Sequence, residues 1–302
     1  MLLITEWTTE SSLKWLDHQG IAYHYAPQGH QHLETLSEPL KNAVALVVRN
    51  QTPVTSELLA QAPCLKAIGR LGVGLDNINL KACQERGIPV LTARGANAPA
   101  VVEYVLGALL SHSRPLPLEM GPWQRHPRGL ELHQQNIGVV GFGDIGRRIA
   151  DVLWMMGATL WVYDPRLGPY DPAVSTRKVR RVPDLETLLK TCDIVTLHAA
   201  LTPATYHLLN DKTLSLMPDH AVLVNTARGQ LIDENALVQQ LRYGRMARVV
   251  LDVREIEPPR QPDPLAEFPD RVWLTPHVAG LTDAAQERTC SMIMESLAPY
   301  LL

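Results

Sequence analysis

The segment over residues 137–165 constrains the fold of this chain most strongly, because it reads as a strand, a glycine turn, a helix and a second strand. A short apolar run precedes Gly141, Gly143 and Gly146, which have the spacing G-x-G-x-x-G. Apolar residues then recur at steps of three and four, as on one face of an amphipathic helix. A second apolar run ends at Asp164, close to the distance of about 20 residues at which dinucleotide-binding units carry an acidic residue. The pattern predicts a βαβ unit that binds a dinucleotide.

Each glycine of this unit has its own expected role. Gly141 permits a tight turn after the strand, Gly143 lets the backbone approach a pyrophosphate, and Gly146 lets the helix pack closely on the strand. The N-terminus of the helix offers N–H groups and a positive dipole end to the phosphates. A carboxylate at Asp164 can accept hydrogen bonds from the adenosine ribose and repels a 2′-phosphate, so we expect NAD rather than NADP. Arg166, two residues further on, could soften this selection.

Composition argues against several other classes of protein. The net charge of −3 argues against nucleic acid or an anionic membrane as the partner. No apolar run is long enough to span a membrane, and the N-terminus lacks the features of a secretion signal. The cysteines are scattered and lack metal-ligand spacing; they are Cys64, Cys83, Cys192 and Cys290. We therefore expect buried thiols in a cytoplasmic protein, without a metal site.

Two stretches of alternating strands and helices predict two parallel α/β sheets. In the first hundred residues the expected strands are 2–4, 21–25, 45–49, 65–69 and 88–92, and the expected helices are 11–18, 55–61 and 78–86. A helix over 99–113 and a proline-rich linker over 114–135 follow. After the glycine unit the expected strands are 193–198, 221–226, 249–253 and 272–275, the expected helices are 184–190, 211–216 and 234–243, and the last twenty residues form one more helix.

Three candidate catalytic residues follow strands of the second sheet, where ligands of such sheets bind. They are Arg228, Glu257 and His277. Arginine grips a carboxylate with two parallel hydrogen bonds, and histidine is the usual proton shuttle near neutral pH. A carboxylate beside the histidine would orient its ring and favour the imidazolium. Each residue alone has an ordinary structural explanation, but together they suit reduction of a 2-keto acid by a nicotinamide, with Arg228 binding the substrate and His277 protonating its oxygen.

Eight motifs in order make the chain resemble the D-isomer-specific 2-hydroxyacid dehydrogenase family almost from end to end. They are VVRNQTPVT at 47–55, GRLGVGLDNIN at 69–79, NAPAVVEY at 97–104, GFGDIG at 141–146, LHAALTPAT at 197–205, NTARG at 225–229, LDVREIEP at 251–258 and TPHVAG at 275–280. Arg254 is a departure, because the family often has phenylalanine there. Because the sequence ends at Leu302, soon after the expected last helix, we expect no appended regulatory domain of the kind that some phosphoglycerate dehydrogenases carry.

The resemblance implies further site residues. The family's catalytic trio of Arg, Glu and His falls on Arg228, Glu257 and His277. The implied cofactor contacts are Gly141, Gly143, Asp144, Ile145, Gly146, Asp164, His198, Thr226, Ala227, Arg228, Asp252, His277 and Gly280. The implied substrate contacts are Arg49, Asn50, Val73, Gly74, Asn97 and Arg228.

The resemblance also implies how the chain is divided and assembled. A Rossmann dinucleotide-binding domain over 98–281 is inserted into a flavodoxin-like substrate domain formed by 1–97 and 282–302. The expected assembly is a homodimer through the dinucleotide-binding domain, with the helix from Pro99 and the linker containing Trp123 at the contact.

Two other functions stay open. One is a dinucleotide-sensing binding protein, like the transcriptional corepressors that resemble this family, since these can keep the catalytic trio. The other is a formate dehydrogenase, which ranks lower because those enzymes have glutamine where this chain has Glu257. The identity of the 2-hydroxy acid is not specified by the sequence.

Overall fold

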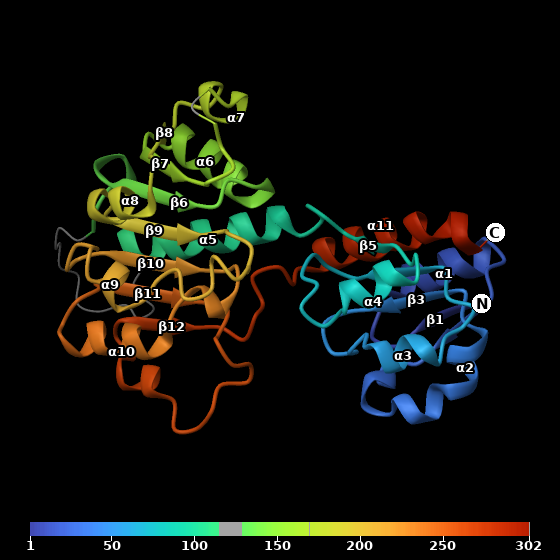
Figure 1. Cartoon of the computed structure of the whole chain (residues 1–302). Coiled ribbons are helices and arrows are strands. Elements are labelled where there is room, and N and C mark those ends of the chain that lie inside the picture. Colours follow the sequence, from blue (N-terminus) through green and yellow to red (C-terminus); the bar gives the residue numbers. More distant parts are fainter. Residues whose placement is uncertain (115–128, 169, 302) are drawn as a thin grey trace, which may run out of the picture. The chain divides into compact units, whose positions relative to one another are not determined.

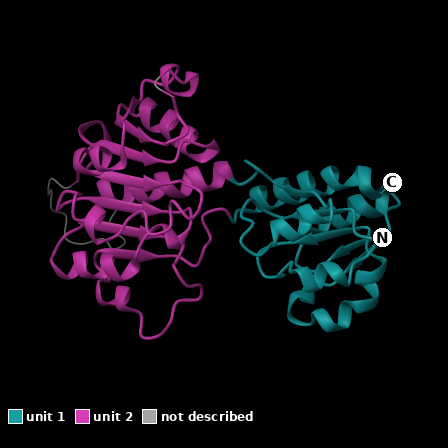
Figure 2. Ribbon diagram, in the orientation of Figure 1, with its two compact units in different colours: residues 1–97, 281–302 teal, residues 98–280 magenta. Residues whose placement is uncertain are grey.

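Two parallel sheets with helices on both faces are built by separate parts of the chain (Figure 1). The computed structural model describes residues 1–114, 129–168 and 170–301. Residues 1–97 and 281–302 form the first unit, and residues 98–280 form the second (Figure 2). The second unit is thus an insertion in the first. The boundary expected at 281/282 lies one residue earlier in the structure.

The first unit contains a five-stranded parallel sheet in the order β2-β1-β3-β4-β5. The strands are β1 (Leu2–Ile4), β2 (Tyr23–Tyr25), β3 (Ala45–Val48), β4 (Ala67–Arg70) and β5 (Val90–Thr92). This order is that of flavodoxin-like sheets. Leu2 of strand β1, which lies between β2 and β3, pairs with Tyr23 on one side and with Ala45 on the other.

Two layers of helices cover this sheet. They are α1 (Glu10–His18), α2 (Ser37–Asn42), α3 (Ser56–Ala60), α4 (Leu80–Glu85) and α11 (Asp283–Leu301), with short 3₁₀ turns η1 (Gly29–Gln31) and η2 (Leu33–Leu36). Leu40, Leu58 and Cys83 pack with one face of the strands, and Leu16 and Ile293 pack with the other. The sequence did not predict α2, which contains Pro39 and buries the single apolar side chain of Leu40, so it shows no apolar period.

The second unit contains a seven-stranded parallel sheet in the order β12-β11-β10-β9-β6-β7-β8. The strands are β6 (Asn136–Val140), β7 (Thr159–Tyr163), β8 (Arg180–Arg181), β9 (Ile194–Leu197), β10 (Val222–Asn225), β11 (Arg248–Leu251) and β12 (Val272–Leu274). The order is that of a Rossmann sheet with one added strand, and it reverses between β6 and β9. The edge strand β8 was not predicted, because two arginines carry no strand signal.

Helices again form two layers. They are α5 (Ala98–Ser113), α6 (Asp144–Met155), α7 (Pro172–Ser175), α8 (Leu185–Thr191), α9 (Asp211–Leu214) and α10 (Glu234–Arg242), with 3₁₀ turns η3 (Leu132–Gln134), η4 (Gly229–Leu231) and η5 (Pro264–Glu267). Apolar side chains of α5 and α6 fill one face of the sheet, and those of α8, α9 and α10 fill the other. Both sheets therefore have the predicted doubly wound α/β architecture. Among the described residues, no helix combines the length and apolar character needed to cross a membrane.

Candidate active site

The glycine turn between β6 and α6 has the geometry that the sequence predicted. Gly141 has a φ of +90°, and a Cβ atom on it would lie 2.6 Å from the backbone of His198 and Ala199. A Cβ atom on Gly146 would lie 2.2 Å from the carbonyl oxygen of Gly141. Gly143 is the N-cap of α6, and a Cβ atom there would meet nothing within 4 Å. Two of the glycines are therefore required by close packing, and the third leaves the N-terminus of α6 open to a ligand.

Asp164 follows β7 and is almost fully buried beside the glycine turn. Its Oδ2 accepts the backbone N–H of Phe142 at 3.0 Å, and the exposed Arg166 guanidinium pairs with it at 3.1 Å. Burial alone would raise the pKa of the Asp164 carboxyl, but the hydrogen bonds from Arg166 and Phe142 outweigh it, so the pKa lies below its ordinary value. Asp164 is thus ionised and tied to the turn, a role that the sequence did not suggest.

Two buried polar atoms lie at the ends of neighbouring strands and have no hydrogen-bond partner within the described residues. They are Nδ1 of His198, after β9, and Oγ1 of Thr226, after β10. Burial lowers the pKa of His198 to about 3, so the ring is neutral, and its Nε2 contacts Oγ1 of Thr196 at 2.8 Å. Buried polar groups normally have partners. Beside the open helix N-terminus, these atoms fit a polar ligand such as the expected dinucleotide.

The buried side chain of Asp252 accepts several hydrogen bonds from the loop after β12. Its Oδ1 accepts the hydroxyl of Thr275 at 2.6 Å and the N–H of Val278 at 2.8 Å, and its Oδ2 accepts the N–H of Ala279 at 2.9 Å. Its backbone oxygen accepts the N–H of His277 at 2.8 Å. Asp252 was predicted as a cofactor contact; the structure adds a loop-supporting role that sequence patterns do not reveal. The direct cofactor contacts predicted at Asp144, Ile145, Ala227 and Gly280 stay predictions.

His277 and Glu257 lie in contact on the loops after β12 and β11. Nδ1 of His277 is 2.9 Å from Oε2 of Glu257. Both side chains are partly exposed, at 47% and 39%. A carboxylate accepts, so Nδ1 carries the proton in this contact and Nε2 is the nitrogen that can face a substrate. His277 has a φ of +56°, and its backbone N–H bond to Asp252 helps to hold this unusual conformation.

Arg228, the third member of the predicted trio, is on the loop after β10. β11 lies between β10 and β12, so all three residues belong to one edge of the second unit's sheet. Nη1 of Arg228 donates to the carbonyl oxygen of Ala227 at 2.6 Å. The structure therefore brings Glu257 and His277 into contact and places Arg228 after β10, two strands from β12 in the same sheet.

Four of the predicted substrate residues of the first unit follow β3 and β4, which are neighbours in its sheet, and Asn97 follows β5. The loop after β3 surrounds the buried carboxylate of Glu6, whose Oε1 accepts the N–H groups of Arg49 at 2.7 Å and Thr52 at 2.9 Å. The Arg49 guanidinium bonds to Gln286 and lies 5.0 Å from the centre of the Trp7 ring. Burial lowers the pKa of Arg49, and its Nε has no hydrogen-bond partner within the described residues.

The other predicted substrate positions of this unit are open to different degrees. Val73 and Asn50 are exposed, and Gly74 and Asn97 are half-buried. Their contacts with substrate stay predictions.

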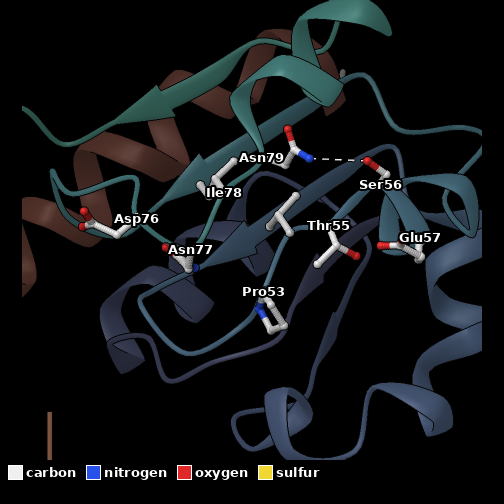
Figure 3. Close-up of a pocket in the computed structure, with 9 residues that line it drawn as sticks. Pro53, Thr55, Ser56, Glu57, Asp76, Asn77, Ile78 and Asn79 are labelled. Atoms are coloured by element: carbon white, nitrogen blue, oxygen red, sulfur yellow. Dashed lines mark hydrogen bonds between the residues drawn. The ribbon is translucent and has the colours of Figure 1, made fainter. Parts of the chain in front are cut away.

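A surface pocket of about 430 Å³ lies beside the loop after β3 of the first unit (Figure 3). It is lined by Pro53, Val54, Thr55, Ser56, Glu57, Asp76, Asn77, Ile78 and Asn79. Thr55 and Asn79 cap helices α3 and α4, and Asn77 donates to the carbonyl oxygens of Arg49 and Thr52. None of the predicted site residues lines this pocket, and these polar side chains already hold the local fold, so we do not place the chemistry there.

Comparison with known proteins identifies the family. The sequence model described as "D-isomer specific 2-hydroxyacid dehydrogenase, NAD binding domain" matches residues 110–279. The chain belongs to this family. The D-isomer specific 2-hydroxyacid dehydrogenase fold and the NAD-binding domain that the sequence predicted are thereby confirmed, and the predicted class of protein, an NAD-dependent dehydrogenase, is that of the family.

Curated relatives of this chain carry different names. The chain is 42% identical over 253 residues to an (S)-sulfolactate dehydrogenase of Chromohalobacter salexigens, covering 81% of this chain and 80% of that protein. It is 39% identical over 274 residues to a D-3-phosphoglycerate dehydrogenase of Methanocaldococcus jannaschii, covering 89% of this chain but only 52% of that longer protein.

A solved structure shows the same fold. The D-lactate dehydrogenase of Aquifex aeolicus, in complex with NAD and lactic acid, superposes with a TM-score of 0.83 at 25% identity, covering 99% of this chain and 94% of that one.

Proposed function

We propose that this dehydrogenase transfers a hydride between NAD and a small D-2-hydroxy acid or its 2-keto acid. The contact of 2.9 Å between His277 and Glu257 carries the proposal, because it is the arrangement of a general acid/base and its orienting carboxylate. The pair is partly exposed, and the same strand edge carries Arg228, His198 and Thr226. His277, Glu257 and Arg228 are assigned as the catalytic residues.

The residues divide the chemistry among them. NADH, when bound, supplies the hydride that goes to the carbonyl carbon of the keto acid. Arg228 holds the substrate carboxylate with its planar guanidinium. Nε2 of His277 donates a proton to the carbonyl oxygen, and in the reverse direction it takes the proton from the hydroxyl. Glu257 fixes the orientation of the ring through its contact with Nδ1. The N-terminus of α6 and Asp164 would hold the pyrophosphate and the adenosine ribose.

The first unit favours a substrate with a second anionic group. Arg49 and Arg70 stand at the carboxyl ends of the adjacent strands β3 and β4. The Arg70 guanidinium lies over Gly72, where a Cβ atom would come within 1.5 Å of its Nη1. Two cations beside the loop that contains Val73 and Gly74 would attract a phosphate, sulfonate or second carboxylate. Sulfolactate and 3-phosphoglycerate, which appear in the names of two relatives, both carry such a group.

NADH oxidation, followed at 340 nm with a panel of keto acids, tests both the proposed reaction and the preference for a second anionic group. The panel contains glyoxylate, hydroxypyruvate, pyruvate, phenylpyruvate, 2-ketoglutarate and 3-phosphohydroxypyruvate. We expect turnover, with higher kcat/KM for the two acids that carry a second anionic group. A higher kcat/KM with pyruvate would contradict the preference for a second anionic group on the substrate, but it would still support the proposed hydride transfer. If none of these acids is reduced although NADH still binds, the result would favour the alternative function of a dinucleotide-sensing binding protein.

Arg166 offers a test of cofactor selection. Its guanidinium already lies on the carboxylate of Asp164, where a 2′-phosphate would come close. We expect Arg166→Ala to lower kcat/KM with NADPH by roughly tenfold, the effect of one charge-assisted hydrogen bond of ~1.5 kcal/mol. The value with NADH should change little. Arg148→Ala, which removes another exposed arginine near the glycine turn, is the control. An unchanged NADPH to NADH ratio in Arg166→Ala would remove Arg166 from cofactor selection.

A homodimer and a cytoplasmic location stay predictions. Helix α5 exposes Gly107 and Leu110, which suits contact with a second copy of the second unit. Trp123, also expected at this contact, lies outside the described residues. Light scattering on the purified protein would give its mass in solution, and the mass of a monomer would reject the dimer.

A further inference from the structure

A buried ion cluster is formed by Arg254, Glu234 and Asp263, next to Glu257. Arg254 is only 7% exposed, and its guanidinium bonds to two carboxylates. Nε and Nη2 donate to the two oxygens of Glu234 at 3.0 and 2.9 Å. Nη1 and Nη2 donate to the two oxygens of Asp263 at 2.7 and 3.0 Å. Both carboxylates therefore have bidentate geometry, which adds directional specificity to the attraction of charges.

The cluster joins three separate elements of the second unit. Glu234 is the first residue of α10, and its Oε1 also accepts the N–H of Glu255 at 2.7 Å. Asp263 is the N-cap of η5, and its Oδ1 accepts the N–H of Leu265 at 3.1 Å. Arg254 itself lies in the loop after β11. Four side-chain hydrogen bonds thus fix the loop backbone at Arg254 between a helix and a 3₁₀ turn.

The backbone of Arg254 is in contact with the catalytic segments. Its N–H donates to Oε1 of Glu257 at 2.9 Å, while Oε2 of the same carboxylate contacts His277. A Cβ atom on Gly229, which follows Arg228, would lie 1.9 Å from the carbonyl carbon of Arg254. The Arg228 segment therefore packs against the residue that orients Glu257.

We propose that Arg254, held by Glu234 and Asp263, is a positioning residue that sets the Glu257 carboxylate against His277. The proposal rests on the catalytic roles proposed above for Glu257 and His277. The buried cluster fixes the N–H of Arg254, the N–H fixes one oxygen of Glu257, and the other oxygen then meets Nδ1 of His277. An apolar side chain could fill the same space, but it would not tie the loop to both α10 and η5.

A second ion pair of the same unit provides a matched control. Nη2 of Arg242, the last residue of α10, bonds to both oxygens of Glu267, the last residue of η5, at 2.9 and 3.1 Å. This pair also joins α10 to η5, but it is about half exposed and none of its hydrogen bonds reaches residues 254–257. Arg242→Met therefore weakens the same junction without touching Glu257.

A double-mutant cycle tests the proposal. kcat is measured with NADH and saturating hydroxypyruvate or 3-phosphohydroxypyruvate for Arg254→Met, Glu257→Ala, the double variant and Arg242→Met. We expect Arg254→Met to lower kcat by roughly 10–100-fold, as the loss of supporting contacts around a site typically does. NADH affinity and the KM for the keto acid should change little. In the Glu257→Ala background, Arg254→Met should lower kcat by no more than about twofold, since no carboxylate remains to be positioned.

Other outcomes would overturn the proposal. A loss from Arg254→Met that is equally large in the Glu257→Ala background would show an effect that does not pass through Glu257. An equal loss in Arg242→Met would assign the effect to the junction of α10 and η5. A wild-type kcat in Arg254→Met would leave the cluster without a part in catalysis.

A triple variant covers the case in which Arg254→Met does not fold, because that change leaves two buried carboxylates without their counter-ion. Combining Arg254→Met with Glu234→Gln and Asp263→Asn removes these charges and keeps oxygens that accept the N–H groups of Glu255 and Leu265. We expect the same loss of kcat in this variant.

The ¹⁵N shifts of the His277 ring give a readout that needs no turnover. In the wild type they should report the proton on Nδ1, and in the triple variant a shift toward Nε2–H. Identical shifts in both proteins would overturn the proposal. If the wild type reduces no keto acid of the panel, the proposed function fails, whereas the ring shifts still decide whether Arg254 positions Glu257.

Discussion

Replacing His277 with alanine should lower kcat by roughly 10²–10⁴-fold, which is the usual contribution of a positioned general acid/base. The ring nitrogen Nδ1 lies 2.9 Å from Glu257, so in the proposed mechanism Nε2 gives the proton to the keto acid. Without the imidazole, the alkoxide formed by hydride transfer would have to take its proton from water. The measurement is kcat for NADH oxidation with the best keto acid of the panel, with NADH binding followed by fluorescence.

The control for this variant is another histidine of the same unit that is paired with a carboxylate. Nε2 of His220 lies 3.0 Å from Oδ1 of Asp193, and the side chain is 68% exposed. His220→Ala should leave kcat unchanged. If His277→Ala retained near-normal kcat, His277 would not be the acid/base, and the contact with Glu257 would be structural only.

Replacing Arg228 with lysine should also cause a large loss, although the charge is kept. A guanidinium can bind both oxygens of a carboxylate in one plane, and an ammonium group cannot. A hydrogen bond to a charged group contributes about 1.5–3 kcal/mol. Losing one such bond in the transition state should lower kcat/KM by roughly 10–150-fold. The bond of Nη1 to the carbonyl oxygen of Ala227, which helps to aim the side chain, would be disturbed as well.

Arg242→Lys gives the comparison for this change, because its guanidinium also bonds to both oxygens of a carboxylate but at a partly exposed site away from the strand ends. It should keep kcat/KM within about twofold, since exposed ion pairs contribute little. A wild-type kcat/KM in Arg228→Lys would show that Arg228 does not bind the substrate carboxylate through two hydrogen bonds.

Much of the fold and the trio could be predicted from the sequence for one physical reason. Carboxyl ends of parallel strands meet at one edge of the sheet, so polar residues that follow buried strands come together even when they are far apart in sequence. Arg228, Glu257 and His277 follow β10, β11 and β12, which are consecutive in the sheet. Strand pattern alone therefore placed them at one edge, and the contact of His277 with Glu257 agrees with this reasoning.

The supporting residues could not be predicted in the same way. Arg254, Glu234 and Asp263 come from different elements and form a buried ion cluster. Because such contacts between elements produce no periodic pattern in the sequence, the cluster could not be predicted. Asp252 was recognised only as a cofactor contact through the family, because nothing in its neighbours indicates that it accepts hydrogen bonds from Thr275, Val278 and Ala279. Strand β8 was missed because its two arginines carry no strand signal, and α2 was missed because it buries only one apolar side chain, that of Leu40.

The position of α11 has a consequence for the order of folding during synthesis. Ile293 and Leu297 of this helix belong to the core of the first unit, and Gly69 in β4 leaves the space that the Ile293 side chain fills. The ribosome therefore delivers the whole of the second unit before it delivers the helix that covers one face of the first sheet. Domains tend to fold as units as they emerge, so the inserted unit can fold first and bring its two ends together. Its folding thereby shortens the loop that must close before α11 docks, and the first sheet remains partly uncovered until that moment.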